Sequence, residues 1–343
     1  MEESRKPLVE IRHLKKYFHI SKDKILHAVD DVNLTVREGE TVGLVGESGC
    51  GKSTVGTVVM RLQPATSGEV LFDGVNVFDV KDRKQNQEYR RQMQIVFQDP
   101  YSSLNPQKTI RQILTEGYRI HKMASGIELD QLLDTLCQRT GISKEMWDQY
   151  PHELDGGKRQ IVGIARALSL NPKFIVCDEP VSSLDVSVQA KVLNLLMQLQ
   201  KDLGLSYLFI SHDLSVVKHI STQIAVMYLG QIVEIADKRT IFADTRHPYS
   251  IALLSAIPKV DVDNKVKRIV LKGDVPSPIN PKPYCRFANR CWMCQAVCTQ
   301  KEPELREVSL GHFVKCHFAE ESRKLMLSAE TSSIDAKTDA ATV

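Results

Sequence analysis

The sequence lacks any long apolar segment and any strong excess of charge. No apolar run approaches the roughly 18 residues that a membrane-spanning helix needs, so the sequence predicts no bilayer crossing. The opening residues, Met1 to Pro7, contain no apolar stretch of the kind found in secretory signals, so we expect a cytoplasmic protein. A net charge of +3 over 343 residues is too small to indicate binding to nucleic acid or to a lipid surface.

The composition otherwise matches that of a soluble globular protein, with 42% hydrophobic and 25% charged residues. A chain of 343 residues can bury a full core and has room for more than one structural unit. Eight cysteines are present, and in the cytoplasm they are better explained as thiols or ligands than as disulfides.

The strongest local pattern is a glycine-rich loop between a predicted strand and a predicted helix. Residues 46–54 read GESGCGKST and fit the pattern G-x-x-x-x-G-K-S/T. They follow an apolar run at 41–45 and open a helix-compatible segment at 52–63. The glycines allow successive backbone N–H groups to point inward at a helix N-terminus, which forms a site for phosphate. We therefore predict a nucleoside triphosphate site here.

Three side chains of this loop have predicted roles. Lys52 would reach the β- and γ-phosphates, the hydroxyl of Ser53 would hold Mg²⁺, and Thr54 would bond the α-phosphate. The complete set of predicted ATP contacts in the loop is Gly46, Glu47, Ser48, Gly49, Cys50, Gly51, Lys52, Ser53 and Thr54.

Strand and helix patterns alternate along the chain. Short apolar or alternating runs predict strands at 8–14, 28–36, 67–74, 92–97, 174–177 and 206–210. Apolar residues spaced by three and four predict helices within 105–150, at 161–170 and at 186–203. The run at 174–177 is apolar throughout, as in strands that are buried on both faces of a parallel sheet. Together these patterns predict an α/β nucleotide-binding sheet.

Four polar residues follow predicted strands, and together they supply what phosphoryl transfer to water requires. Asp178 closes a strand and can bind Mg²⁺ directly or through water. Glu179, the next residue, is suited to polarise the attacking water. Gln98 can touch both the metal and the water, and His212 can contact the γ-phosphate. Their joint order along the chain predicts an ATP-hydrolysing site.

These motifs, in this order, resemble the ATP-binding subunits of ABC transporters over residues 8–256. The resemblance places the Q-loop at Gln98, the signature at 154–160, the Walker B strand at 174–179, and a D-loop, SSLD, that ends in Asp185. It narrows to the oligopeptide/dipeptide importers through three further segments, FQDPYSSLNP at 97–106, HPY at 247–249 and LLSAIP at 253–258.

That resemblance implies a fold and a set of partners. The fold would be a P-loop NTPase, with a RecA-like core, an antiparallel β subdomain and a helical subdomain at about 100–165. Two ATPase subunits would meet head to tail, each ATP lying between one chain's phosphate loop and the other chain's signature. They would drive two transmembrane permease subunits, supplied by an extracytoplasmic solute-binding protein, from the cytoplasmic side of the cell membrane. Nucleic acid is not an expected partner. Phe18 would stack on adenine, with Tyr17 as the alternative.

The signature departs from the usual Leu-Ser-Gly-Gly-Gln of the family, because here it reads Leu154-Asp155-Gly156-Gly157-Lys158. Asp155 is a good N-cap, so the helix is expected to form normally. A carboxylate about 4 Å from a phosphate charge would oppose it by about 4 kcal/mol at an effective dielectric constant of about 20, and Lys158 would offset part of this. Two interpretations follow: an asymmetric heterodimer in which the partner's ATP faces a weakened signature, or an Asp155 that only caps its helix.

A proline-rich segment after residue 258 contains five cysteines. Cys285, Cys291, Cys298 and Cys316 are separated by five, six and seventeen residues, and Cys294 lies among them. The spacing is not that of a zinc finger, but four thiols in so short a cytoplasmic segment favour a bound metal. A C-terminal extension of the same importers resembles this pattern and holds a 4Fe–4S cluster in some members. The resemblance therefore implies iron–sulfur ahead of zinc, with free thiols as the remaining alternative.

We therefore predict three parts: an ATP-binding domain at 1–257, a Cys-rich C-terminal extension at 258–321 and a disordered tail at 322–343. The predicted function is ATP hydrolysis, with ATP and Mg²⁺ bound, that powers import of oligopeptides or dipeptides. An alternative within the class is import of another solute, such as nickel or a sugar. An alternative from another class is a soluble ABC ATPase acting on nucleic acid or ribosomes, although the chain has no long coiled-coil insertion and no second cassette.

Overall fold

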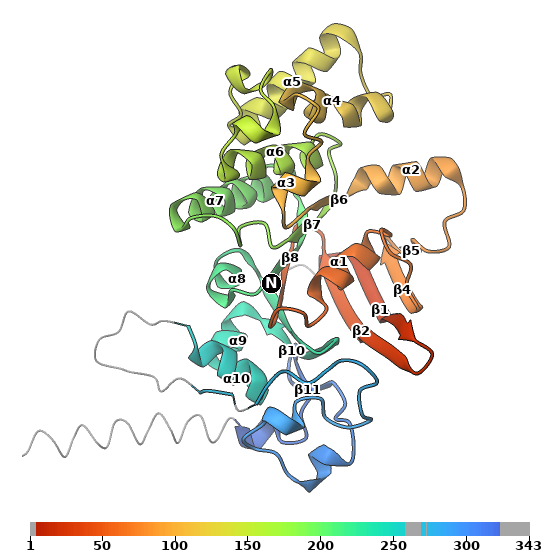
Figure 1. Cartoon of the computed structure of the whole chain (residues 1–343), viewed down its shortest axis with the longest axis vertical. Coiled ribbons are helices and arrows are strands. Elements are labelled where there is room, and N and C mark those ends of the chain that lie inside the picture. Colours follow the sequence, from red (N-terminus) through yellow and green to blue (C-terminus); the bar gives the residue numbers. More distant parts are fainter. Residues whose placement is uncertain (1–4, 258–268, 272, 323–343) are drawn as a thin grey trace, which may run out of the picture.

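The computed structural model describes residues 5–257, 269–271 and 273–322. The predicted disordered tail at 322–343 lies outside the described residues, apart from Ser322. Two sheets and the helices around them form the described part of the chain, and the strands β11 and β12 lie at the end opposite α4 and α5 (Figure 1).

The first part of the chain forms an antiparallel sheet with the strand order β2-β1-β4-β5. Its strands are β1 (Pro7–Ser21), β2 (Lys24–Arg37), β4 (Ser67–Phe72) and β5 (Val75–Asn76). β1 and β2 extend beyond the apolar runs that predicted them, because the chain after Leu14 continues to pair across the hairpin until Ser21 meets Lys24. The tip of this hairpin is polar and exposed, so apolar periodicity alone does not mark its end.

The second sheet, which carries the site, has the strand order β11-β12-β10-β9-β3-β8-β7-β6 within the described residues. Neighbours from β9 to β6 are parallel, whereas β10, β11 and β12 join antiparallel. The strands are β3 (Thr41–Val45), β6 (Met93–Val96), β7 (Phe174–Asp178), β8 (Ser206–Ser211), β9 (Gln223–Tyr228), β10 (Gln231–Asp237), β11 (Arg306–Ser309) and β12 (His312–Val314). Since parallel strands end at the same edge, the polar residues after β3, β6, β7 and β8 converge there.

Helices cover both sheets and form a separate group at one end of the molecule (Figure 1). α1 lies between the two sheets, where it contacts β1, β2, β7 and β8. The α-helices are α1 (Lys52–Val59), α2 (Arg83–Gln92), α3 (Pro100–Ser103), α4 (Ile110–Ile120), α5 (Gly126–Thr140), α6 (Gly156–Leu168), α7 (Val186–Leu203), α8 (Leu214–Ile220), α9 (Lys238–Ala243) and α10 (Pro248–Ser255). None of the helices in the described part of the chain has both the length and the apolar character that a membrane crossing requires.

Two apolar cores hold the sheet edge in place. One lies between the two sheets around α1 and includes Val55, Val58 and Phe72. The other packs α4 to α7 on the main sheet and includes Leu196 and Phe209. Because α1 is buried against both sheets, it holds the C-terminal end of the preceding loop in place.

The Cys-rich segment adds to the main sheet. β12 pairs with β10, with Glu234 opposite Val314, and β11 pairs with β12. Glu234 is fully buried and accepts hydrogen bonds from the imidazole of His312 (2.8 Å) and from the backbone N–H of Arg246 (2.7 Å). Burial alone would raise the pKa of Glu234, but these bonds hold it below the ordinary value. The extension is therefore locked to the sheet by a buried carboxylate.

Candidate active site

The phosphate loop at 46–51 connects β3 to α1 and passes close to neighbouring strands. Gly51 caps α1 with φ of 109°, and a Cβ there would lie 2.1 Å from the carbonyl oxygen of Ala28 in β2. A Cβ at Gly46 would lie 2.2 Å from the carbonyl oxygen of Met227 in β9. Only glycine fits at these two positions, because any side chain would collide with a carbonyl oxygen of the neighbouring strand. The loop can therefore pass this close to the strands only with glycine at both positions.

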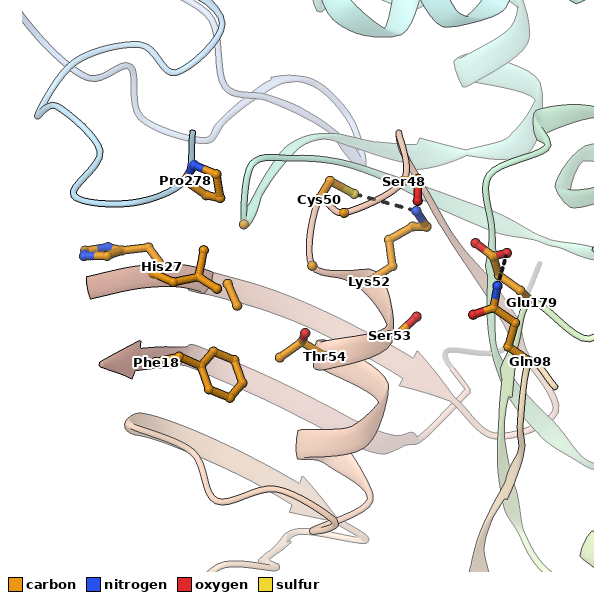
Figure 2. Close-up of a pocket in the computed structure, with 15 residues that line it drawn as sticks. Phe18, His27, Ser48, Cys50, Lys52, Ser53, Thr54, Gln98, Glu179 and Pro278 are labelled. Carbon is orange, nitrogen blue, oxygen red and sulfur yellow. Dashed lines mark hydrogen bonds between the residues drawn. The ribbon is translucent and has the colours of Figure 1, made fainter. Parts of the chain in front are cut away.

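Lys52 occupies the first turn of α1 and is buried. Its ammonium group donates to the carbonyl oxygens of Gly46 (2.9 Å) and Glu47 (3.0 Å). Figure 2 shows the side chain turned from the helix toward Ser48 and Cys50. The ammonium charge is thereby placed within the loop, where an anion would meet it.

A pocket of about 240 Å³ extends from this loop in two directions. On one side its wall is largely apolar, and on the other it ends at polar residues (Figure 2). The lining residues are Phe18, Leu26, His27, Ala28, Ser48, Gly49, Cys50, Gly51, Lys52, Ser53, Thr54, Gln98, Glu179, Gly230 and Pro278. The pocket thus offers an apolar end for a flat ring, a phosphate loop in the middle and a polar end where hydrolysis can take place.

Phe18, rather than Tyr17, lines the apolar end of the pocket. The hydroxyl of Tyr17 donates to Asp30, and its ring stacks on that of His27 with centroids 4.0 Å apart. Lys16 lies over the ring of Phe18, with Nζ 4.7 Å from the centroid. The hydroxyl of Tyr17 is therefore engaged outside the pocket. The position of the two side chains favours Phe18 over Tyr17 for the stacking role.

Ser53 and Asp178 meet beside the phosphate loop. The Ser53 hydroxyl donates to Oδ1 of Asp178 across 2.8 Å. Burial, followed by the charge of Glu179, raises the pKa of Asp178, although the Ser53 bond opposes the rise. A hydroxyl and a carboxylate are hard oxygen donors of the kind Mg²⁺ accepts, so this pair fits that ion chemically.

Glu179 follows Asp178 and turns away from it through a left-handed backbone conformation, with φ of 45°. Its Oε2 accepts from Nε2 of Gln98 (3.1 Å) and lies 3.2 Å from Nδ1 of His212. A non-glycine residue in this conformation is strained, and such strain is found where a side chain must be aimed. The structure therefore brings together Gln98, Glu179 and His212 around a single carboxylate oxygen.

The signature residues lie away from this pocket. Asp155 accepts from the backbone N–H of Lys158 (2.8 Å), which caps α6 and lowers the pKa of Asp155. The side chains of Asp155 and Lys158 are 62% and 56% exposed and lie 3.4 Å apart. Asp185 stands at the N-terminus of α7 without a capping bond from its side chain. Neither Asp155, Gly156, Gly157, Lys158 nor Asp185 lines the ATP pocket of its own chain.

The Cys-rich segment places its thiols near one another without grouping them tightly. Burial is the main cause that raises the pKa of Cys285 to about 11 and that of Cys291 and Cys316 to about 12. The backbone N–H of Cys285 donates to the carbonyl oxygen of Cys298 across 3.2 Å, so these two cysteines lie side by side. Cys294 is exposed. Within residues 5–257, 269–271 and 273–322, however, no three His, Cys, Asp or Glu side chains are placed to hold a metal ion.

Several residues at the site were not anticipated from the sequence. Pro278 and His27 line the pocket, the hydroxyl of Tyr249 accepts from the backbone N–H of Glu47 (2.8 Å), and Arg290 pairs with the Glu47 carboxylate. Tyr249 stands in the HPY segment, which supported the resemblance but suggested no role. Arg290 directly precedes Cys291, and this position beside a cysteine was the only feature of the sequence that pointed to Arg290.

Comparison with known sequence families gives two matches. Residues 29–182 match the family described as ABC transporter. Residues 233–298 match the family described as oligopeptide/dipeptide transporter, C-terminal region. The first match contains the phosphate loop, Gln98 and Glu179, and the second contains Pro278 and Arg290.

Individual proteins are similar over almost the whole chain. YkfD of Bacillus subtilis (strain 168) is 50% identical over 316 residues, covering 91% of this chain and 96% of YkfD. The oligopeptide transport ATP-binding protein AppF of the same organism is 46% identical, covering 90% of this chain and 97% of AppF. Among solved structures, the ATP-binding cassette MJ0796, a dimer bound to ADP and Pi, is 28% identical with a TM-score of 0.62, covering 68% of this chain and 99% of MJ0796.

Proposed function

The chain belongs to the family of oligopeptide transport ATP-binding proteins within the ABC transporters, and we propose that it hydrolyses ATP to power a peptide importer. The observation that carries the proposal is the pocket lined by the phosphate loop, Ser53, Gln98 and Glu179, where Asp178 contacts Ser53 and His212 contacts Glu179. The similarity to AppF, a named oligopeptide transport ATP-binding protein, over nine tenths of both chains supports peptides as the solute.

ATP binding is assigned to the apolar end and the centre of the pocket. Phe18 would stack on the adenine ring, since its ring faces the pocket and lies in line with the phosphate loop (Figure 2). The backbone N–H groups of the loop residues would surround the phosphates, and Lys52 and Thr54 would bond them. Mg²⁺, when bound by Ser53, Asp178 and Gln98, would neutralise charge that develops on the transferring phosphoryl group.

Hydrolysis is assigned to the polar end. Glu179 would accept a proton from the attacking water, because its carboxylate faces the pocket and is nearly buried. Gln98 and His212 hold Oε2 of Glu179 in place, and His212 would contact the γ-phosphate. The left-handed backbone of Glu179 separates its side chain from Asp178, so that one carboxylate serves the metal and the other serves the water.

We further propose that the chain works in a dimer with a second, different ATPase. The exposed side chains of Asp155 and Lys158 would face ATP bound by the partner, and Asp185 would lie at the same interface. The dimeric MJ0796 cassette supports a dimer of ATPase subunits, and the departure of Asp155 from the usual signature is what favours a partner of different sequence. A partner with a regular signature would complete the site built on Lys52, Asp178, Glu179 and His212. The site that borrows Asp155 would be the weaker one.

The remaining partners follow from the same proposal. Two transmembrane permease subunits would receive the motion of the dimer, and an extracytoplasmic solute-binding protein would deliver the peptide to them. The chain would then act as a peripheral protein on the cytoplasmic side of the cell membrane. Residues 1–257 would form the ATPase domain, and residues 258–321 an extension that adds β11 and β12 to its sheet.

The thiols of this extension do not fit a single metal ion, because no three candidate ligands among the described residues are placed to hold one. A polynuclear cluster is wider than one ion, so its thiolates stand farther apart. Cys285 and Cys298 are joined by a backbone hydrogen bond of 3.2 Å, and Cys291 and Cys316 belong to the same short segment. We therefore propose a 4Fe–4S cluster, rather than zinc, held by Cys285, Cys291, Cys298 and Cys316. Anaerobic purification should yield brown protein with about four iron and four sulfide per chain, and protein without iron would contradict the proposal.

Copurification tests the proposed function as a whole. The full-length chain, isolated from membranes of its native host, should bring down two integral membrane proteins and a second ATPase. Uptake of labelled di- and oligopeptides should depend on the chain and be lost with Lys52→Ala. Uptake of nickel or a sugar instead of peptides would show that the transporter imports that solute and not peptides. Recovery of nucleic acid or ribosomes without membrane proteins would refute the transport function.

A further inference from the structure

The Cys-rich segment reaches the ATP pocket of the same chain at two places. Pro278 lines the pocket beside His27 (Figure 2), and the backbone N–H of His27 donates to the carbonyl oxygen of Pro278 across 3.0 Å. Arg290 reaches Glu47 in the phosphate loop. A segment that the sequence predicts to lie outside the ATPase domain therefore supplies part of the wall and part of the support of the nucleotide site.

The contact between Arg290 and Glu47 is a two-bond ion pair. Nη1 of Arg290 donates to Oε2 of Glu47 (2.8 Å), and Nη2 donates to Oε1 (3.2 Å). The side chains are 8% and 26% exposed. Paired bonds between a guanidinium and a carboxylate fix both the position and the orientation of the carboxylate, and burial limits screening by solvent.

Glu47 is held through its side chain by Arg290 and also through its backbone. Its backbone N–H donates to the hydroxyl of Tyr249 (2.8 Å), and its carbonyl oxygen accepts from Lys52 (3.0 Å). The next residues, Ser48 and Gly49, line the pocket. The position of Glu47 therefore determines where the loop N–H groups and the Lys52 ammonium stand before any nucleotide arrives.

The base from which Arg290 reaches the loop is itself fixed. Phe287 is 1% exposed and packs edge-on against Tyr228, with ring centroids 5.3 Å apart. Arg286 donates to the carboxylate of Asp30 and to the carbonyl oxygen of Leu229, which lie beside the pocket residues His27 and Gly230. Such an anchored arginine can hold the loop, whereas a mobile surface arginine could not.

We propose that Arg290 is a positioning residue for ATP binding, which acts through Glu47 to keep the phosphate loop shaped for the phosphates. The proposal rests on the proposed function, because it requires that ATP bind in this pocket. Without Arg290 the loop must become ordered when ATP binds, so affinity for ATP falls. The chemical step changes little, since Gln98 and Glu179 belong to the polar end of the pocket, outside the phosphate loop (Figure 2), and His212 contacts Glu179.

The experiment compares three full-length variants in the assembled transporter complex. Arg290→Met removes both bonds to Glu47, and Arg290→Lys keeps the charge on one nitrogen, which lacks the planar fork of the guanidinium. Arg306→Met is the matched control, because Arg306 forms a two-bond pair with Glu320 (2.7 Å for each bond) in the same segment but makes no contact with the loop. We expect Arg290→Met to raise the KM for ATP about tenfold, equivalent to about 1.4 kcal/mol, at nearly unchanged kcat. Arg290→Lys should lie between, and Arg306→Met should match the unmutated complex.

The split between KM and kcat separates positioning from a loss of folded protein. A complex that merely contains less folded chain loses apparent kcat and keeps its KM, and that result for Arg290→Met would overturn the proposal. Glu47→Gln gives an independent test, because Arg290→Met should add almost nothing to the KM of that variant if it acts through Glu47. Full additivity would count against the proposal. If the unmutated complex binds no ATP, the proposed function fails, whereas an unchanged KM in Arg290→Met with normal ATP binding refutes this inference alone.

Discussion

Replacing Asp155 with asparagine removes one negative charge from the signature while leaving the helix cap in place. Oδ1 of Asp155 accepts from the backbone N–H of Lys158 (2.8 Å), and an asparagine oxygen can accept the same bond, since Asn and Asp are comparable caps. If the Asp155 carboxylate faces phosphate in the site of the partner ATPase, Asp155→Asn should raise ATP turnover at that site. The asymmetric heterodimer therefore makes a prediction that a simple capping role does not.

The size of the effect follows from Coulomb's law and two features of the structure. Two unit charges about 4 Å apart repel by about 4 kcal/mol at an effective dielectric constant of about 20, and by about 1 kcal/mol in water. Lys158 lies 3.4 Å from the Asp155 carboxylate and offsets part of its charge, and both side chains are more than half exposed. The lower value is therefore the better guide, and about 1 kcal/mol corresponds to an increase in turnover of about fivefold.

The assay isolates the site that borrows Asp155. Glu179→Gln in this chain should silence the site on its own phosphate loop, so the remaining ATPase activity of the complex comes from the partner's site. Adding Asp155→Asn or Asp155→Ser should raise that activity, more at low salt than at high salt. Asp155→Ala serves as the control for capping, because it removes the charge but costs about 1 kcal/mol of helix stability. Unchanged turnover in both Asp155→Asn and Asp155→Ser would leave only the capping role.

Two further predictions test the adenine end and the buried His247 at the N-terminus of α10. Phe18→Ala should weaken ATP binding about 5- to 150-fold, because stacking on a base contributes about 1–3 kcal/mol. Tyr17→Phe keeps its ring contact with His27 and should bind ATP normally. Equal losses of ATP affinity in titrations of the two variants would contradict the assignment. Burial lowers the pKa of His247 to about 4. Between pH about 6.5 and pH about 4 the unfolded chain therefore binds a proton that the folded chain does not. The free energy of unfolding then decreases by up to about 3 kcal/mol as the pH is lowered. His247→Asn keeps an acceptor for the Tyr249 N–H and should flatten that slope in urea unfolding at pH 7 and pH 5; an unchanged slope would show that His247 is not its cause.

The parts of the site that the sequence predicted are those built from neighbouring residues. The phosphate loop needs glycines at fixed offsets, and the same residues fold over β2 and β9 in the structure. β3 at 41–45 and α7 at 186–203 have the bounds predicted from apolar periodicity. Asp178 and Glu179 could be assigned to one site because each parallel strand of the sheet ends at the same edge.

The parts that the sequence did not reveal depend on contacts between distant residues. Arg290 and Glu47 are separated by 243 positions, and no local pattern links them. α6 begins at Gly156, five residues before the predicted start, because the Asp155 cap holds two glycines in a helix that they would not favour alone. β9 and β10 were not predicted at all, although their strand pairing connects the extension to the sheet.

The most direct test of the central claim is ATP binding and hydrolysis by the assembled complex that carries Glu179→Gln, measured with Mg²⁺ present. Glutamine has the shape of glutamate and can still face Gln98 and His212, but it cannot accept a proton from water. The site on this chain should therefore bind ATP as tightly as before while its turnover falls by about 10²- to 10⁴-fold. Turnover near that of the unmutated complex, or failure of the unmutated complex to bind ATP, would contradict the account.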